Sequence, residues 1–279
     1  MIEKTPEVVE YLKTCVFSAT SVNTYLRNPY EFYQNYVLGL KEQENLLDDP
    51  ESRHIGTFVH QVLEDAFIPF IGKKPLIDKE FRRRFTRIFE SRFYETFGRG
   101  MKSDAFLIKA VLENRLGRFL DTEAARVKDE VRELMLIERK FEDVIALSCG
   151  QVRFSCRIDR VDRLEDGTIL ILDYKTGGAD AMPSAFDPSP AMSRQRLRDE
   201  LVSFQMPLYL YYLDKQYPHE PVNAALVHLR TMRIEKFMSA KTTIPRPQLI
   251  GGFMKALDFV MTEIFNPEIP FTDDPLDIE

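Results

Sequence analysis

Residues 169–177 read ILILDYKTG, and this stretch decides the fold. Its four consecutive aliphatic residues predict a strand that is buried on both faces in the middle of a sheet. An acidic and a basic residue follow two positions apart, as Asp173 and Lys175. Because strand side chains return to the same face every second residue, both charged groups are expected on the face that carries Ile169. Charges at the end of a buried strand require a stabilising partner.

The turn before this strand predicts which residue lies opposite Asp173. Glu165–Gly167 is a turn signal between two strands, and we interpret it as a three-residue hairpin loop whose glycine is left-handed. Leu164 then pairs with Thr168, and counting back places Asp159 directly opposite Asp173. Directly opposed residues share a face, with Cβ atoms about 4.5–5.5 Å apart. A two-residue turn would shift this pairing by one position.

Two buried carboxylates that face each other repel unless a divalent cation lies between their oxygens. Hard cations such as Mg²⁺ or Mn²⁺ favour oxygen ligands. Lys175 would lie beside the metal and near any bound anion. This layout suits phosphodiester hydrolysis, in which the metal polarises a phosphoryl oxygen and the lysine orients water or offsets charge. The alternative is a cross-strand Asp-Arg or Asp-Lys ion pair at a sheet edge, for which Arg157, Arg160 and Arg163 are near enough.

Composition excludes several other classes of protein. The 279 residues carry a formal net charge of −6, which argues against coating nucleic acid through overall charge but leaves room for a local basic groove. Three scattered cysteines argue against a disulfide framework and favour the cytoplasm. The first residues lack a signal peptide, and no apolar run reaches membrane-spanning length, so no membrane contact is expected. No Walker-type sequence occurs, so we expect no nucleotide-driven motor in this chain.

Periodicity predicts mainly helical text first and strands afterwards. Residues 151–164 alternate, with Val152 and Ile158 expected to face the core and Asp159 expected on the opposite face. Residues 177–198 are interpreted as a mobile loop. The expected helices cover about 1–14, 56–70, 76–97, 103–129, 199–216 and 246–265, with two short helices in 22–40. Besides 151–164 and 169–175, the expected strands cover about 134–142, 221–230 and 233–238.

This order of elements predicts an α+β or mixed α/β fold, in which helices flank a central mixed β-sheet. We expect one domain over residues 1–279. Within it, residues 1–130 form a mainly helical portion and residues 131–265 form the catalytic sheet core. Residues 266–279 are expected to be a loosely ordered tail.

Five motifs in collinear order resemble the signature of the PD-(D/E)XK nuclease superfamily, and within it the RecB-like branch. They are SATSVNTYLRNPYEFYQNYVLGL (18–40), GTFVH (56–60), RIDRVD (157–162), DYKTG (173–177) and QMPLY (205–209). The pattern is most similar to the nuclease domains of AddB-type helicase–nuclease subunits. The resemblance implies a restriction-endonuclease-like core and a Mg²⁺- or Mn²⁺-dependent DNA nuclease, expected to be an exonuclease of repair and recombination. The alternative is a non-catalytic module that binds DNA ends or holds a motor subunit.

The resemblance also implies roles for single residues. His60, Asp159, Asp173 and the backbone carbonyl of Tyr174 would be metal ligands. Lys175 would be the catalytic lysine. Taken alone, a histidine on an apolar helix is more often an interior residue than a ligand. Its place after Gly56-Thr57 and ahead of the carboxylates favours the ligand.

Further candidates surround this set. Gln205 and Tyr209, four residues apart on one helix face, would support the lysine or contact substrate, although they could simply cap a core helix. Arg194 and Arg196 follow the active strand and are candidates for contacts with DNA phosphates. Glu64 could be a partner of His60, or it could belong to a solvated helix face. Glu138 could position the metal or a water, or it could be a surface charge on a strand.

One departure from the family concerns a cofactor. Many relatives hold an iron–sulfur cluster on one cysteine near the N-terminus and three near the C-terminus. Asn28 stands at the N-terminal position, and the last hundred residues contain no cysteine. No iron–sulfur cluster is therefore expected. The expected partners are DNA and a helicase or ATPase motor subunit.

Overall fold

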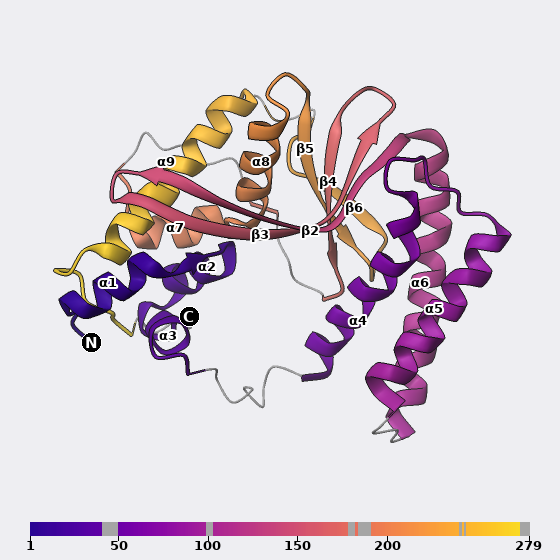
Figure 1. The fold of residues 1–279 in the computed structure, drawn as a ribbon, viewed down its shortest axis with the longest axis horizontal. Coiled ribbons are helices and arrows are strands. Elements are labelled where there is room, and N and C mark those ends of the chain that lie inside the picture. The colour runs from indigo at the N-terminus through magenta and orange to yellow at the C-terminus, as the bar shows by residue number, and fades with distance from the viewer. Residues whose placement is uncertain are drawn as a thin grey trace.

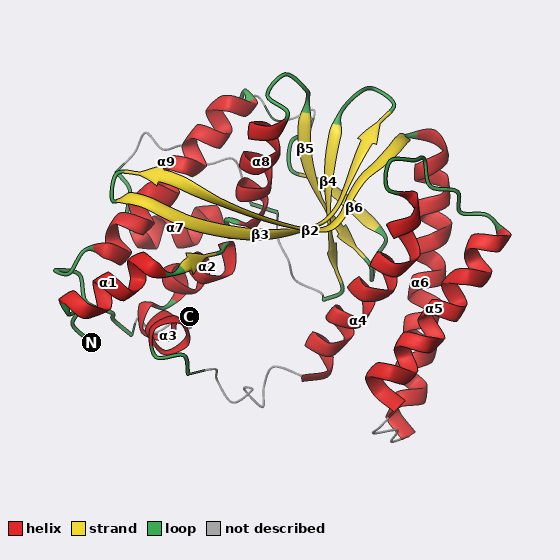
Figure 2. Cartoon of the chain, in the orientation of Figure 1, coloured by secondary structure: helices red, strands yellow, loops and turns green. Residues whose placement is uncertain are grey.

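The computed structural model describes residues 1–40, 50–98, 103–177, 182–183, 191–239, 242 and 244–273. Within these residues a six-stranded mixed sheet forms the centre, and helices cover both of its faces (Figures 1 and 2). The expected fold class is confirmed. The strands are β1 (Val16–Phe17), β2 (Val131–Leu147), β3 (Gly150–Leu164), β4 (Ile169–Lys175), β5 (Val222–His228) and β6 (Arg233–Lys236).

The helices precede and follow this sheet in the chain, largely as periodicity predicts. They are α1 (Pro6–Thr14), α2 (Ala19–Arg27), α3 (Pro29–Phe32), α4 (Pro50–Phe67), α5 (Lys79–Phe97), α6 (Ser103–Asp129), α7 (Arg194–Leu201), α8 (Gln205–Gln216) and α9 (Arg246–Phe265), with the short π-helix η1 (Tyr33–Val37) and the 3₁₀ helix η2 (Ile68–Phe70). Among the described residues, no helix combines the length and the apolar character that a membrane span requires.

The hairpin between β3 and β4 has the expected register. The N–H of Leu164 donates to Thr168 O at 2.8 Å, and Gly167 has a φ of 86°, which glycine adopts without strain. The pairing of Arg160 with Leu172 continues this register. The three-residue loop is therefore confirmed, and the next step of the ladder sets residue 159 opposite residue 173.

Two hydrophobic cores lie on opposite faces of the sheet. Ile169 and Ile171 of β4 join the core under α1, α2, α7, α8 and α9, whereas Leu170 and Leu172 join the core under α4, α5 and α6. Figure 1 shows these two groups of helices on either side of the strands. The four-residue aliphatic run therefore serves both cores, as expected for a strand buried on both faces.

Phenylalanines at every fourth position attach α5 to α4, the helix that carries the GTFVH motif. Phe81, Phe85, Phe89 and Phe93 are all buried, and the rings of Phe89 and Phe93 pack against Phe58 of α4. Spacing of four residues places these rings on one helix face. The packing fixes α4 against the sheet and so fixes the direction in which its polar side chains point.

The segment before α8 differs from the sequence expectation. Instead of a loop through residue 198 and one helix from 199, the structure has α7 beginning at Arg194, with Ser193 Oγ accepting the N–H of Arg196. Val202, at φ 59°, separates α7 from α8. Ser193 is an N-cap residue that the serine-rich composition concealed. Part of the expected loop, residues 178–181 and 184–190, lies outside the described residues.

The two ends of the described chain pack together. Ile2 and Phe271 form an antiparallel bridge, and Phe271 is fully buried. Asn28 Nδ2 donates to Asp273 Oδ1 at 2.8 Å. Residues 266–273 are therefore held by contacts and differ from the expected loose tail, because Phe271 fills a place in the core of α1–α3. Residues 274–279 lie outside the described residues.

Candidate active site

Three carboxylates lie in a row across three neighbouring strands. The β2–β3 ladder pairs Arg139 with Ile158, so Glu138 lies opposite Asp159. The β3–β4 ladder sets Asp159 opposite Asp173, and Asp159 Oδ2 accepts the N–H of the next residue of β4 at 2.7 Å. Asp159 and Asp173 are 6% and 2% exposed. The burial of Asp159 agrees with its expected place opposite Asp173.

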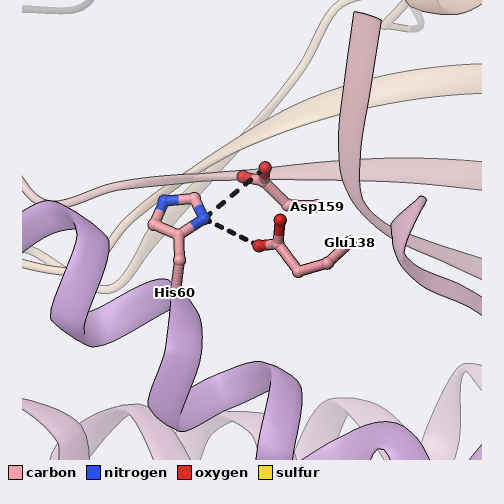
Figure 3. Close-up of side chains that lie close together, drawn as sticks. All are labelled: His60, Glu138 and Asp159. Atoms are coloured by element: carbon pink, nitrogen blue, oxygen red, sulfur yellow. Dashed lines mark hydrogen bonds and ion pairs between the residues drawn. The ribbon is translucent and has the colours of Figure 1, made fainter. Parts of the chain in front are cut away.

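His60 projects from α4 toward this row (Figure 3). Its Nδ1 lies 2.9 Å from Glu138 Oε1 and 3.5 Å from Asp159 Oδ1, and its Nε2 lies 3.2 Å from Tyr174 O. A carboxylate and a carbonyl oxygen both accept, which favours the protonated ring, and a ring nitrogen must lose its proton before it can ligate a metal. Burial alone would lower the pKa of His60, but the Glu138 hydrogen bond and the charges of Asp159 and Glu138 raise it to about 9.

Burial raises the pKa values of two of these carboxylates, Asp159 and Asp173. Burial and then the charge of Asp173 raise the pKa of Asp159 to about 8. Burial also raises the pKa of Asp173, although the nearby Lys175 ammonium opposes the shift. Groups held in this way are stabilised by a positive charge among them. The His60 imidazolium supplies one such charge.

The donor set fits a hard divalent cation. His60, Glu138 and Asp159 each offer one ligand atom, and these atoms lie within 4.8 Å of one another. Asp173 does not belong to this group, but its buried Oδ2 accepts no hydrogen bond from the described residues, although the Lys175 ammonium lies 3.0 Å away. A nitrogen, several carboxylate oxygens and the nearby Tyr174 carbonyl match the ligands that Mn²⁺ or Mg²⁺ takes. The ligand roles of His60, Asp159, Asp173 and Tyr174 remain predictions.

Lys175 is held by a polar network that joins β4 to α8. Its Nζ donates to Gln205 Oε1 at 3.0 Å and lies 3.0 Å from Asp173 Oδ2. Gln205 Nε2 in turn lies 2.9 Å from Asp173 Oδ1 and 2.8 Å from Tyr209 Oη. Tyr209 Oη also donates to Asp173 Oδ1, at 3.3 Å. The spacing of four residues on α8 therefore brings Gln205 and Tyr209 onto the same carboxylate.

A cavity of about 530 Å³ lies beside the carboxylates and the polar network. His60, Glu138, Asp159, Gln205 and Tyr209 all line it. Glu64 also lines this cavity but makes no hydrogen bond with His60 in the described structure, so its expected pairing with His60 is not formed.

Arginines near the site are already paired with other acids. Arg194 lies 3.3 Å from Glu263, and Arg196 lies 2.9 Å from Glu200. Their expected role in DNA contact remains a prediction.

Asp173 pairs with Lys175 of its own strand, but neither aspartate pairs with the three alternative arginines among the described residues. Arg160 contacts Asp162 and Glu123, Arg163 contacts Glu220, and Arg157 lies 3.7 Å from Glu138. These arginines therefore do not neutralise Asp159 or Asp173.

The sequence matches the model of one known protein family. The model of the PD-(D/E)XK nuclease superfamily matches residues 16–276, which is most of the chain. The chain belongs to this superfamily. PD-(D/E)XK nucleases use divalent metals, and the His60, Glu138 and Asp159 group is a place where this member could bind one.

Curated proteins are similar in sequence to part of this chain. An AddB-type subunit of the ATP-dependent helicase/deoxyribonuclease of Streptococcus uberis is 28% identical over 167 residues, covering 57% of this chain and 14% of that protein. The subunit of the same name from Streptococcus agalactiae is 27% identical over 164 residues, again 57% and 14%. An uncharacterized protein of Rickettsia felis is 28% identical over 166 residues, covering 58% of this chain and 19% of that protein. The expected resemblance to AddB-type subunits is confirmed, and the match spans less than a fifth of each relative's length.

Glu138 lies in a different environment from the one its sequence context suggests. The interpretation as a surface strand charge is wrong, because the side chain is 6% exposed and contacts His60. Its φ of 44° marks a bend in β2 that simple alternation does not predict. A usable signal is the two-residue turn at Ser148-Cys149, since Leu147 pairs with Gly150 and counting back reaches the pair of Glu138 and Asp159.

Glu138→Gln is expected to weaken Mn²⁺ binding about 10- to 100-fold, whether Glu138 is a ligand or orients His60. The matched control is Glu64→Gln, which removes a carboxylate from the same cavity without touching the His60 group. Isothermal titration calorimetry of the purified proteins measures the difference. Equal affinities for the two variants would show that Glu138 takes no part in metal binding.

Proposed function

We propose that this chain is a divalent-metal-dependent DNA nuclease that hydrolyses phosphodiester bonds. The observation that carries the proposal is the row of Glu138, Asp159 and Asp173 across three strands, with His60 at one side and Lys175 at the other. Asp159 and Asp173 are buried acids with raised pKa values, and such groups are costly to the fold. They are expected where a cation and an anionic substrate use them.

In this proposal His60, Glu138, Asp159, Asp173 and the Tyr174 carbonyl would hold Mg²⁺ or Mn²⁺. The bound cation would polarise a phosphoryl oxygen and lower the pKa of a water. Lys175 would offset negative charge that develops on the phosphate. Gln205 and Tyr209 act through Asp173 and Lys175, since their hydrogen bonds fix the rotamers of both side chains.

We further propose that the nuclease degrades DNA from an end, together with a helicase or ATPase motor, in repair and recombination. The names of the streptococcal relatives support this context. Both cores share the single sheet, which supports one nuclease domain over residues 1–279. The three cysteines are free thiols, which supports work in the cytoplasm.

The test compares two DNA substrates of the same sequence, one linear and end-labelled, the other a covalently closed circle. Purified protein with Mg²⁺ or Mn²⁺ is expected to shorten the linear duplex and leave the circle intact, and EDTA is expected to stop the reaction. Cutting of the circle would contradict the end-dependent action. Absence of cutting on both substrates would contradict the nuclease proposal and favour a module that only binds DNA ends.

A further inference from the structure

Two arginines from different elements converge where β4 ends. Arg115 of α6 donates from Nη1 to Thr176 O at 3.4 Å, directly after the lysine of the active site. Arg230 follows β5 and comes one residue after Leu229, whose N–H donates to Lys175 O at 3.0 Å. The Arg115 guanidinium is thus bonded to the residue after Lys175, and the backbone just before Arg230 is bonded to Lys175 itself.

The bond from Leu229 to Lys175 sets Arg230 beside the residue that Arg115 contacts, and no carboxylate of the described residues serves either arginine as a counter-ion. Burial and then the charge of Arg230 lower the pKa of Arg115, as expected for neighbouring like charges. Neither Arg115 nor Arg230 forms a salt bridge with a carboxylate in the described part of the chain. Arg115 is partly buried and Arg230 is exposed, so an anion in solvent can reach the pair.

The turn that carries Arg230 is held in a fixed shape. His228 O accepts the N–H groups of Thr231 at 3.2 Å and Met232 at 2.8 Å. Met232 has a φ of 61°, a conformation that is strained for a non-glycine residue. Its side chain packs against the core under α4–α6. Local strain that the surrounding packing maintains often accompanies a functional site.

The other arginines near the site contrast with this pair. Arg194 and Arg196, which the sequence nominates for DNA contact, each face an acid, Glu263 and Glu200. Their charges are therefore offset within the protein. Complementarity with a polyanion favours the side of Lys175 that lies toward α6.

We propose that Arg115 and Arg230 together bind a backbone phosphate of the DNA strand that occupies the active site, on the α6 side of Lys175. This inference rests on the proposed nuclease function. Guanidinium groups suit phosphate because their donors match its oxygens. A contact of this kind positions the strand without selecting its sequence, as a nuclease acting on any DNA end requires.

The test measures how salt weakens DNA binding. Binding of a fluorescent single-stranded oligonucleotide is followed by anisotropy from 50 to 200 mM salt (about the range over which phosphate contacts are lost), in Ca²⁺ without Mg²⁺ or Mn²⁺. Arg115→Gln/Arg230→Gln is expected to reduce the steepness of log K against log salt by about 0.7, the contribution of one phosphate on a single strand. Arg83→Gln/Arg87→Gln removes two exposed arginines of α5 and is the matched control, expected to keep the wild-type slope.

Two further measurements separate strand positioning from a structural role. The lysine pair, Arg115→Lys/Arg230→Lys, is expected to keep the wild-type slope, because counter-ion release depends on charge. The glutamine pair is expected to keep wild-type Mn²⁺ affinity, since neither arginine touches the His60 group. In cleavage assays its KM should rise while kcat stays within about threefold. A slope equal to that of the α5 control, or loss of Mn²⁺ binding, would overturn the inference.

Failure of this inference and failure of the nuclease proposal give different results. If the slopes of the wild type and the glutamine pair differ as expected but the wild type cuts no DNA in Mn²⁺, the phosphate contact is supported and the nuclease proposal is contradicted. If the wild type cuts DNA and the glutamine pair has the wild-type slope, the nuclease proposal is supported and the phosphate contact is contradicted. Absence of DNA binding by the wild type would overturn the contact as well.

Discussion

Lys175→Ala is expected to lower kcat on linear DNA about 100- to 1000-fold, the usual effect of removing one group that stabilises charge in a transition state. The side chain lies 3.0 Å from Asp173 Oδ2 and 3.0 Å from Gln205 Oε1, so its ammonium is held beside the buried carboxylate. Single-turnover cleavage of an end-labelled duplex in Mn²⁺ measures the loss. The effect should appear in kcat more than in KM, because Lys175 acts on charge that develops during the reaction.

Lys215→Ala is the matched control, since its ammonium pairs with Asp143 on the surface. Cleavage by this variant is expected to equal that of the wild type. Thermal unfolding of both variants separates catalysis from folding, and Lys175→Ala should keep a Tm near the wild-type value. Wild-type cleavage by Lys175→Ala would exclude this lysine from the chemistry.

The second large effect concerns stability. Asp162→Ala is expected to cost about 3–5 kcal/mol in the free energy of unfolding, the usual result of breaking a buried ion pair from one side. Asp162 is fully buried and accepts from Arg126 at 2.5 Å and from Arg160 at 2.7 Å. Glu123 bonds the same two arginines, each at 2.8 Å. Removing one acid therefore leaves two buried guanidinium groups with a single carboxylate.

Urea denaturation measures this loss, and Glu220→Ala is the matched control. Glu220 also pairs with an arginine of β3, Arg163, but the two side chains are 35% and 22% exposed. An exposed pair contributes about 1 kcal/mol or less. Equal losses in the two variants would show that the Asp162 network is not what stabilises this part of the sheet. That result would contradict the two roles that the structure indicates for the RIDRVD motif, in which Asp159 belongs to the site and Asp162 stabilises the fold.

The part of the site that could be predicted follows from local rules. Gly167 permits one tight hairpin loop, and that loop alone sets Asp159 opposite Asp173. The four-residue spacing of Gln205 and Tyr209 likewise places them on one helix face. In each case the prediction depends on a period or a turn that a few neighbouring residues determine.

The remainder depends on tertiary packing. Glu138 is buried against a histidine of another element and has a φ of 44°, neither of which alternation can show. Arg115 and Arg230 are 115 residues apart in the chain and meet only because α6 packs beside the end of β4. Arg115 on its own looks like one charge on a solvated helix, and Arg230 looks like a turn residue. Nothing local distinguishes them from arginines without a role.

The bridge between Ile2 and Phe271 joins positions that are separated by almost the whole chain. Closing so long a loop carries a large entropic cost, so we expect this bridge to form late in folding and to open early in unfolding. It fastens the layer of α1–α3, and Ser18, Ala19 and Thr20 of that layer border the cavity. We expect opening of this bridge to loosen that wall of the cavity, whereas the three acids belong to the sheet.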